Sequence, residues 1–484
     1  MDGVHILVFI HALASAIMIL IFNCWIEIMS KYTPSLIAIQ LATCMGFLVV
    51  QLDVSVVNVG LGSLKNAFNT NLTGLQWVIN SYALVFAALL IIGGAFGDKF
   101  GARNIFIWGF ALFTVGSIGC GLANSMSVLI ALRGVQGMGA ALLVPTSLTL
   151  IRLSFTDPAM RRTAVATWGA CGGVALAAGP VLGGVLIQSF GWRSVFLINV
   201  PLGLLAVLLI LRSAPPSPRV NKKVDGLGQG TIAISIAALT YGLTQSSAEG
   251  WSRGPLAMMA VAAIFLVLFI LVQRRVASPM LPPRLAKNKI LATTALCGAV
   301  INLTFYGTVF DLSIYFQSIR HYDAIKTGLS FIPLTAVLTI STMVSTRVAK
   351  KVSDIRIITI GFSVQIIGFI LLSHLTESSS LLFLNGTLMM VGIGSAMSVP
   401  SITNSMLSSV SQNDAGMASG LMASARQIGG VIGVGLFGAM IAHSDLRSFS
   451  TGMAYGMWLS AFCLMMCLGV NALALRRDEV QVKA

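Results

Sequence analysis

Residues 162–203 read RTAVATWGACGGVALAAGPVLGGVLIQSFGWRSVFLINVPLG, and this stretch decides the fold. It is too apolar for a soluble domain, yet seven helix-breaking residues interrupt it: Gly169, Gly172, Gly173, Gly179, Pro180, Gly183 and Gly184. A helix inside a bilayer must satisfy its own backbone, so a Gly-Pro step is tolerated where a neighbouring helix packs closely or a cavity is lined. The stretch therefore predicts a membrane helix that bends at a packed seam.

The composition of the 484-residue chain predicts a membrane protein with many spans. Hydrophobic residues make up 56% and charged residues 9%, against about 25% charged in soluble domains. The net charge of +15 does not indicate nucleic-acid binding, because the Lys and Arg residues fall in short connections between apolar runs. The cysteines and histidines form no ligand cluster, so we expect no metal site and no disulfide framework.

Apolar runs of about 20 residues are long enough to cross a membrane. Fourteen such runs follow one another, at 36–60, 75–95, 104–123, 126–152, 163–188, 194–212, 227–245, 255–273, 290–316, 326–348, 354–375, 380–409, 416–442 and 452–475. A further apolar run covers residues 4–28. Met29 would be an ordinary translation start. We therefore expect residues 1–35 to be an N-terminal extension that results from a start site placed too far upstream, and a real fifteenth span is the alternative.

The Lys and Arg residues predict the orientation of these spans. Of the 30, 22 lie in one set of alternate connections and six in the other, with Arg133 and Arg426 inside spans. The positive-inside rule places the richer set in the cytoplasm. We therefore expect a multi-pass protein of the plasma membrane, which is the inner membrane in a bacterium, with residues 476–484 as a cytoplasmic tail.

A Pro-rich, basic stretch, SAPPSPRVNKKVDG, divides the spans into two groups. Such a composition is typical of a linker in which no helix continues. We expect an all-α protein with six spans in 36–212, the linker and two further spans in 213–289, and six spans in 290–475.

Several motifs resemble those of one family. GPVLGG (179–184) resembles the antiporter motif in the fifth helix of the major facilitator superfamily. WRSVFLINVPLG (192–203) resembles the start of the sixth helix in its drug:proton antiporters with 14 spans, and GGAFGDKFGARN (93–104) resembles the superfamily's signature loop. The resemblance extends from residue 36 onward and implies the major facilitator fold, with two six-helix bundles and two inserted helices between them. It also implies that the two bundles are parallel repeats, with a substrate site between them near the middle of the membrane.

In the signature loop, the resemblance implies a conformational latch formed by Gly94, Asp98, Lys99, Gly101 and Arg103. A short glycine turn with one acid and two bases would let Asp98 reach a helix N-terminus or a basic partner in the other bundle. An ordinary positively charged loop is the alternative.

Arg133 and Asp53 are the candidates for proton coupling. Arg133 lies in the apolar run 129–145, where an unpaired charge costs about 2.5–3.5 kcal/mol, so we expect a partner inside the bundle. Burial of a carboxyl such as Asp53 favours protonation and a nearby arginine opposes it, so the group can switch. The stretch VVQLDVSVVNVGLGSL (49–64), which carries Asp53, resembles a signature of the first span in this branch of the family. LIALRGVQGMGAALLVP (129–145), which carries Arg133, resembles the family's proton-coupling motif. A purely structural arginine is the alternative. Which face of the first span lines the cavity stays open, because a second polar stripe lies nearly opposite, at Gln51, Ser55 and Asn58.

Asp311 is the other acid deep in a core span. It shares one helical face with Thr304, Thr308 and Tyr315. An acid among hydroxyls and an aromatic ring suits a lipophilic cation. We expect these residues to bind substrate or a proton, and a structural hydrogen-bonded acid is the alternative.

The resemblance implies a drug:proton antiporter that exports amphipathic, cationic small molecules by alternating access and is not an enzyme. Its partners would be the lipophilic substrate, protons, membrane lipids and a periplasmic adaptor. The proton gradient would supply the energy, so no cofactor is expected. The alternatives are a dedicated exporter of one metabolite, antibiotic or siderophore, and more remotely a membrane sensor or enzyme.

Overall fold

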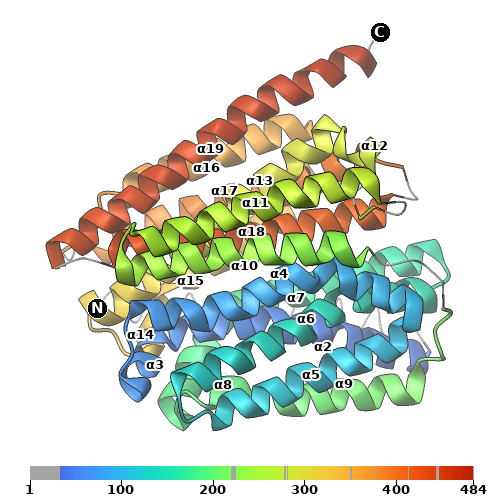
Figure 1. Ribbon diagram of the computed structural model, residues 1–484, viewed down its shortest axis with the longest axis horizontal. Helices are drawn as coiled ribbons and strands as arrows, with labels where there is room; N and C mark the ends of the chain where they lie inside the picture. Colours follow the sequence, from blue (N-terminus) through green and yellow to red (C-terminus); the bar gives the residue numbers. More distant parts are fainter. Residues whose placement is uncertain are drawn as a thin grey trace.

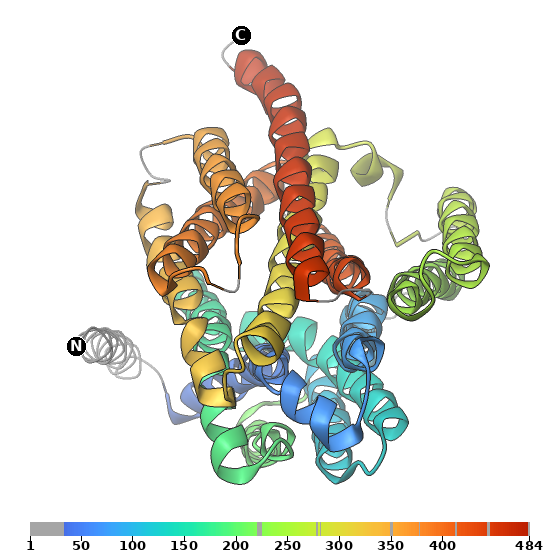
Figure 2. The same cartoon turned by 90° about the vertical axis from the view of Figure 1, so that its left-hand side faces the viewer.

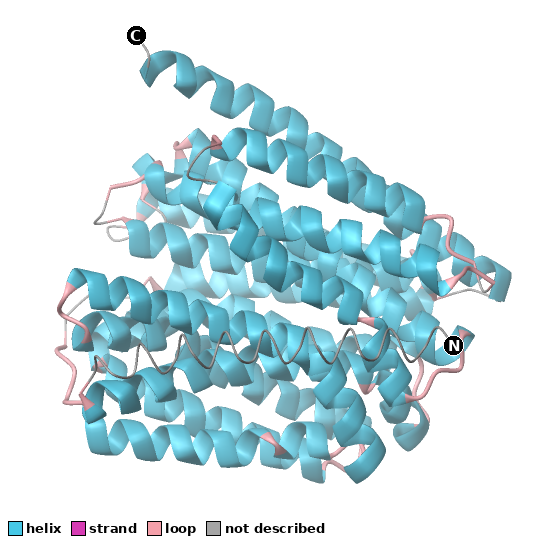
Figure 3. Cartoon of the chain, turned by 180° about the vertical axis from the view of Figure 1, so that it is seen from behind, coloured by secondary structure: helices cyan, strands magenta, loops and turns pink. Residues whose placement is uncertain are grey.

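The computed structural model describes residues 33–219, 225–276, 279–280, 282–348, 352–376, 378–411, 414–442 and 446–482. Within these ranges the chain forms long helices that lie side by side and are joined by short loops (Figure 1, Figure 3). No strand occurs among the described residues, so the predicted all-helical class is confirmed. The apolar run 4–28 lies outside the described residues, and so does Met29, the expected translation start.

The first six-helix bundle begins at Pro34. Its helices, with the short ones between them, are α2 (Pro34–Val59), α3 (Leu61–Phe68), α4 (Leu72–Phe100), α5 (Ala102–Leu122), α6 (Met126–Ser154), α7 (Pro158–Phe190), α8 (Ser194–Leu197) and α9 (Asn199–Ser213). Polar residues set several starts, because the side chains of Asn71, Ser125 and Asp157 each accept a hydrogen bond from a first-turn N–H.

The second bundle follows two inserted helices. The inserted pair is α10 (Gly226–Glu249) and α11 (Arg253–Arg275). The second bundle comprises α12 (Pro283–Ala286), α13 (Lys289–Ile314), the π-helix η1 (Tyr315–Ile319), α14 (Ala324–Ser330), α15 (Ile332–Val348), α16 (Asp354–Leu372), α17 (Leu381–Ser408), α18 (Ala415–Ile441) and α19 (Leu446–Val482).

Thirteen helical segments among the described residues are long and apolar enough to cross a membrane. They correspond to thirteen of the fourteen predicted runs. The other run, 326–348, is divided at Phe331 between α14 and α15.

The inserted pair covers one side of the contact between the bundles (Figure 2). Here α10 packs against both α4 and α18. Asn80 of α4 donates from Nδ2 to Thr244 Oγ1 at 3.0 Å, and Leu243 lies against Gly435 of α18. Most of α11 is exposed, as expected for a helix that faces lipid.

The predicted packed seam lies along α7, which continues through Gly179 and Pro180 as one helix. Glycine is required there because neighbouring atoms leave no room for a side chain. A Cβ added at Gly179 would lie 2.5 Å from Ser55 Oγ, and one at Gly184 would lie 2.6 Å from the carbonyl oxygen of Ala324. The seam therefore joins α7 to α2 in its own bundle and to α14 in the other bundle.

The end of the molecule that carries α3 and α14, named the α14 end below, is closed. Across it Gly62 donates to Gln317 Oε1 at 2.5 Å, and Gln76 donates from Nε2 to the carbonyl of Val434 at 2.9 Å. Towards the opposite end of α7, a side chain added at Gly173 would meet no atom within 4 Å. The bundles thus meet tightly at the α14 end.

Candidate functional site

Asp53 and Arg133 form a buried ion pair inside the first bundle. Arg133 Nη1 of α6 donates to Asp53 Oδ2 of α2, and both residues are 1% exposed. Arg133 Nε also donates to the carbonyl of Val78 at 2.9 Å, and Nη1 to Gln136 Oε1 at 3.0 Å. The expectation that Arg133 has a partner within the bundle is therefore met by Asp53.

The second carboxylate oxygen is held by two amides. Asp53 Oδ1 accepts hydrogen bonds from Gln136 Nε2 and Asn199 Nδ2, each at 3.2 Å. Gln136 Nε2 also donates to Ser117 Oγ at 2.8 Å. Side chains from α6 and α9 thus bond the carboxylate of α2, and Ser117 of α5 bonds these amides in turn. These bonds compensate the cost of burying the carboxylate.

Aromatic rings close this network from the sides. The Arg133 guanidinium carbon lies 4.4 Å from the centre of the Tyr82 ring and 5.9 Å from that of Phe196. Cation–π contacts of this kind are stronger where water is excluded. The charge pair is therefore buried and bonded to several neighbours, which any change of charge at Asp53 must rearrange.

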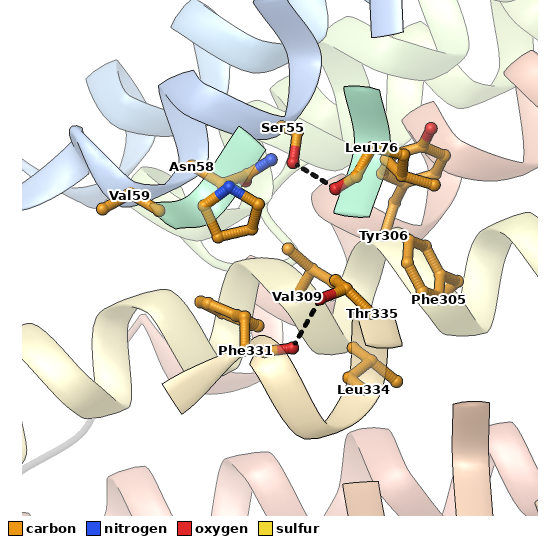
Figure 4. A pocket seen from close by; sticks show the side chains of 11 residues that line it. Ser55, Asn58, Val59, Leu176, Phe305, Tyr306, Val309, Phe331, Leu334 and Thr335 are labelled. Carbon is orange, nitrogen blue, oxygen red and sulfur yellow. Dashed lines mark hydrogen bonds between the residues drawn. The ribbon is translucent and has the colours of Figure 1, made fainter. Parts of the chain in front are cut away.

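A pocket lies on the other face of α2, between the bundles (Figure 4). Its polar edge is formed by Ser55, which donates to the Leu176 carbonyl at 3.0 Å, and by Asn58, which donates to the Val54 carbonyl at 2.8 Å. The structure thus places Ser55 and Asn58 at the interface and Asp53 in the bundle interior. Gln51 is half-buried and is not among the lining residues.

The rest of the pocket wall is apolar and comes from both bundles. The lining residues beyond Ser55 and Asn58 are Val59, Leu176, Pro180, Phe305, Tyr306, Val309, Phe331, Leu334 and Thr335. The cavity volume is about 20 Å³, close to the space of one water molecule and far below the roughly 300 Å³ of a drug site. A drug-sized molecule can enter only if the bundles move apart.

The predicted face around Asp311 points into the second bundle. Thr304, Thr308, Asp311 and Tyr315 are all buried, and none lines the pocket. Thr308 Oγ1 lies 3.8 Å from Met457 Sδ of α19, and Tyr315 donates to the carbonyl of Thr376 at 2.8 Å. The neighbouring face of α13, with Phe305 and Tyr306, faces the pocket instead.

The signature stretch 93–104 is mostly helical, which corrects the expectation of a glycine loop. Gly94, Asp98 and Lys99 lie within α4, because the helix continues to Phe100, and only Gly101, with φ of +92°, separates it from α5. Arg103 anchors the start of the linker. Its N–H donates to Ser217 Oγ at 3.1 Å, and Nη2 donates to the Leu211 carbonyl at 3.0 Å.

The antiporter motif occupies the seam between bundles. Gly183 packs on Val56 of α2, and Gly184 packs on α14. In return, Gly328 of α14 lies against Pro180, where an added Cβ would be 2.2 Å from the proline carbonyl oxygen. Pro180 and Gly184 therefore lie where the bundles would have to separate, whereas Gly179 and Gly183 pack on α2 of the same bundle.

Sequence reasoning missed three contributors to the buried network. All three are buried: Asn199 and Tyr82 contact the charged pair, and Ser117 accepts hydrogen bonds from Gln136 and Asn199. An asparagine inside the apolar LINVPLG stretch was a signal, because a buried amide needs partners. Ser117 and Tyr82 carried no such signal, since both are common in membrane helices.

Comparisons with known proteins agree with this arrangement. Residues 43–434 match the profile of the Major Facilitator Superfamily. A methylenomycin A resistance protein of Bacillus subtilis (strain 168) is 33% identical over 88% of this chain and 92% of its own length. The multidrug resistance protein Stp of Mycobacterium tuberculosis (strain CDC 1551 / Oshkosh) is 32% identical over 83% of this chain and 75% of its own length.

A third relative and one solved structure extend the comparison. The cephamycin export protein CmcT of Amycolatopsis lactamdurans is 35% identical over 84% of this chain and 85% of its own length. A bacterial homolog of the human lysosomal transporter Spinster, in an inward-facing and unoccupied conformation, superposes with a TM-score of 0.66. The superposition covers 92% of this chain and 98% of the homolog's chain. The sequence identity is 16%, so the similarity is one of fold. The profile match and these relatives show that the chain belongs to the Major Facilitator Superfamily.

Proposed function

We propose that this chain is a proton-coupled efflux transporter that exports amphipathic small molecules by alternating access. The observation that carries the proposal is the buried Asp53–Arg133 pair, whose acid lies on the same helix as the polar edge of the pocket. The names of the relatives, which include drug-resistance and antibiotic-export proteins, support the direction of transport.

The geometry of Asp53 suits a coupling role. As a carboxylate it accepts charge-assisted bonds from three donors, on Arg133, Gln136 and Asn199. Such bonds contribute about 1.5–3 kcal/mol each, and protonation of the carboxylate weakens all of them. Proton binding would therefore loosen α2 from α6 and α9. Because Ser55 and Val56 pack on α7, this loosening would reach the seam.

The seam is then the element that moves. With the Lys- and Arg-rich end in the cytoplasm, the tight contacts at the α14 end correspond to a transporter that is closed towards the outside. One proton that crosses a membrane potential of 100 mV supplies about 2.3 kcal/mol. In the proposed cycle, this energy would drive the separation of the seam.

The pocket favours substrates with aromatic or apolar bodies. No acid is among its lining residues, so the faces of Phe305, Tyr306 and Phe331 offer the attraction available to a cation. A neutral amphipathic compound would fit this lining equally well. The test panel should therefore contain both classes.

A dedicated exporter of a single antibiotic is the second candidate. The specific observation in its favour is that two relatives are named for resistance to methylenomycin A, at 33% and 29% identity. A response to one compound of a broad panel would favour this candidate.

The test uses inside-out membrane vesicles that hold an imposed pH gradient. Ethidium, tetraphenylphosphonium and methylenomycin A are added in turn, and proton release is followed with a fluorescent dye. We expect dissipation with wild type and none with Asp53→Asn. Asp225→Asn is the matched control, because Asp225 is a buried acid that bonds Gln273 outside the network. Dissipation by Asp53→Asn equal to wild type would exclude coupling through Asp53.

A further inference from the structure

The two bundles repeat one sequence pattern around a buried acid. LDVS occupies residues 52–55 of α2, and FDLS occupies residues 310–313 of α13, which are the first helices of the two bundles. A second pair of matching stretches lies in the fourth helices of the bundles, GMGAALLVP (137–145) in α6 and GIGSAMSVP (392–400) in α17. Each has its proline inside the helix. The repeat therefore places Asp311 at the position of Asp53.

The repeat keeps the acid but not its partners. Four residues before the matched stretches lie Arg133 in α6 and Leu388 in α17, so a buried leucine replaces the arginine. In the sixth helices, Asn199 bonds Asp53, whereas Gly456 of α19 lies next to Asp311. A Cβ added at Gly456 would be 3.5 Å from Asp311 Oδ2.

Asp311 is consequently a buried carboxyl without a bonding partner. It is 0% exposed, and neither of its oxygens has a hydrogen-bond partner among the described residues. The ring of Phe437 closes the site next to Gly456, and the neighbouring hydroxyl of Thr308 is directed to Met457. An isolated carboxylate in such surroundings carries a large desolvation cost, while a neutral acid carries a small one.

In the part of the chain that the structure describes, no hydrogen bond or ion pair joins a charged group to Asp311. On α18 the ionisable residue is Arg426, which bonds Asn302 more than two turns away, and on α19 Tyr455 is 62% exposed. The described part of α17 has no ionisable residue. Among the side chains that the structure describes, the other ionisable ones on α13 and the helices packed against it are Cys44, Asp53, Lys65, Arg284, Lys289, Cys297, Tyr306, Tyr315, Cys463 and Cys467.

We propose that Asp311 is a second proton-binding site, built by the repeat inside the second bundle. In the state closed at the α14 end, the carboxyl holds a proton on one oxygen. When α13, α18 and α19 separate, water enters, the O–H bond breaks and the proton passes to water, which leaves a hydrated carboxylate. The reverse step reloads the site. This proposal rests on the proposed proton-coupled function and adds a proton to its cycle, with no contact between Asp311 and the exported molecule.

The test is infrared difference spectroscopy of the purified full-length chain in lipid nanodiscs, between about pH 5 and pH 9. A protonated carboxyl gives a C=O stretching band that shifts in heavy water. We expect a titrating band that is lost in Asp311→Asn and kept in Asp53→Asn. Thr308→Val, which changes a neighbour but not the acid, should keep the band. A band assigned to Asp311 that stays constant over the pH range, or the absence of any such band, would overturn the proposal.

This readout needs no exported substrate, so it separates the two proposals. Titration of Asp311 in a protein that fails the vesicle assay would support the site while refuting coupled efflux. Loss of drug-driven proton release in Asp53→Asn, together with a constant Asp311 band, would support efflux while refuting the second site. In the vesicle assay itself, with ethidium as the probe, Asp311→Asn should reduce the protons moved per ethidium without abolishing ethidium transport.

Discussion

Replacing Gly328 by alanine tests whether the seam at the α14 end has to open during transport. The new Cβ would lie 2.2 Å from the Pro180 carbonyl oxygen and 2.9 Å from its carbonyl carbon. Both are backbone atoms, so no side chain can rotate away. Ordinary contact needs about 3.5 Å, and α14 must therefore move from α7 by about 1 Å.

The cost of this overlap sets the size of the effect. Overpacking of one methyl group costs about 1–3 kcal/mol, and here it falls on the closed state alone. A difference of that size shifts a two-state equilibrium by roughly 5- to 150-fold. We therefore expect Gly328→Ala to populate the state that is open at the α14 end.

Spin labels on two exposed lysines can measure the shift. Lys65 on α3 and Lys326 on α14 belong to different bundles, and each is changed to cysteine in a background without the native cysteines. Double electron–electron resonance should show longer distances between the two spin labels in Gly328→Ala than in the doubly labelled protein without this substitution. Gly173→Ala is the matched control, because its Cβ would meet nothing within 4 Å. An unchanged distance distribution in Gly328→Ala would refute the closed seam described here.

Three other substitutions test single contacts. Arg133→Lys keeps the charge but loses the planar guanidinium that bonds Asp53, the Val78 carbonyl and Gln136 together, so we expect at least about tenfold less ethidium-driven proton release in vesicles. Asn199→Leu removes a donor to the Asp53 carboxylate and should lower the free energy of unfolding by about 1–3 kcal/mol, measured by thermal melting in detergent. Thr244→Val leaves the Asn80 amide without its partner on α10 and should destabilise to a similar extent while transport selectivity stays unchanged.

The charged pair could be predicted from the sequence because its physics is local. An arginine in an apolar span is costly wherever the helix lies, so Arg133 had to have a partner, and the deep acids Asp53 and Asp311 were the available ones. The glycines of α7 were informative for the same reason, since a membrane helix contains them where another helix approaches closely. The need for a partner of Arg133 and for close packing at the glycines of α7 therefore follows from each helix sequence by itself.

The direction of each helix face could not be predicted in this way. Periodicity placed Asp311 and Thr308 on one face of α13, and both are buried as expected. Rotation of α13 towards α19 or towards the pocket depends on packing against helices that are far away in the sequence. The stretch 93–104 shows a related limit, because its glycines suggested a loop while the main-chain bonds of α4 continue to Phe100.

Helix α2 connects the chemistry of the first bundle to the space between the bundles. One face carries Asp53 into the ion pair, and another carries Ser55 and Asn58 to the pocket edge. Val56 lies against Gly183 of α7, next to the glycine that contacts α14. A rigid helix cannot move one face without the others, so a change of bonding at Asp53 would also change the pocket and the seam. Among the described residues, the second bundle has no equivalent of this ion pair, because Leu388 stands in the place of Arg133. The response of α13 to Asp311 would therefore depend on the burial of the carboxyl alone.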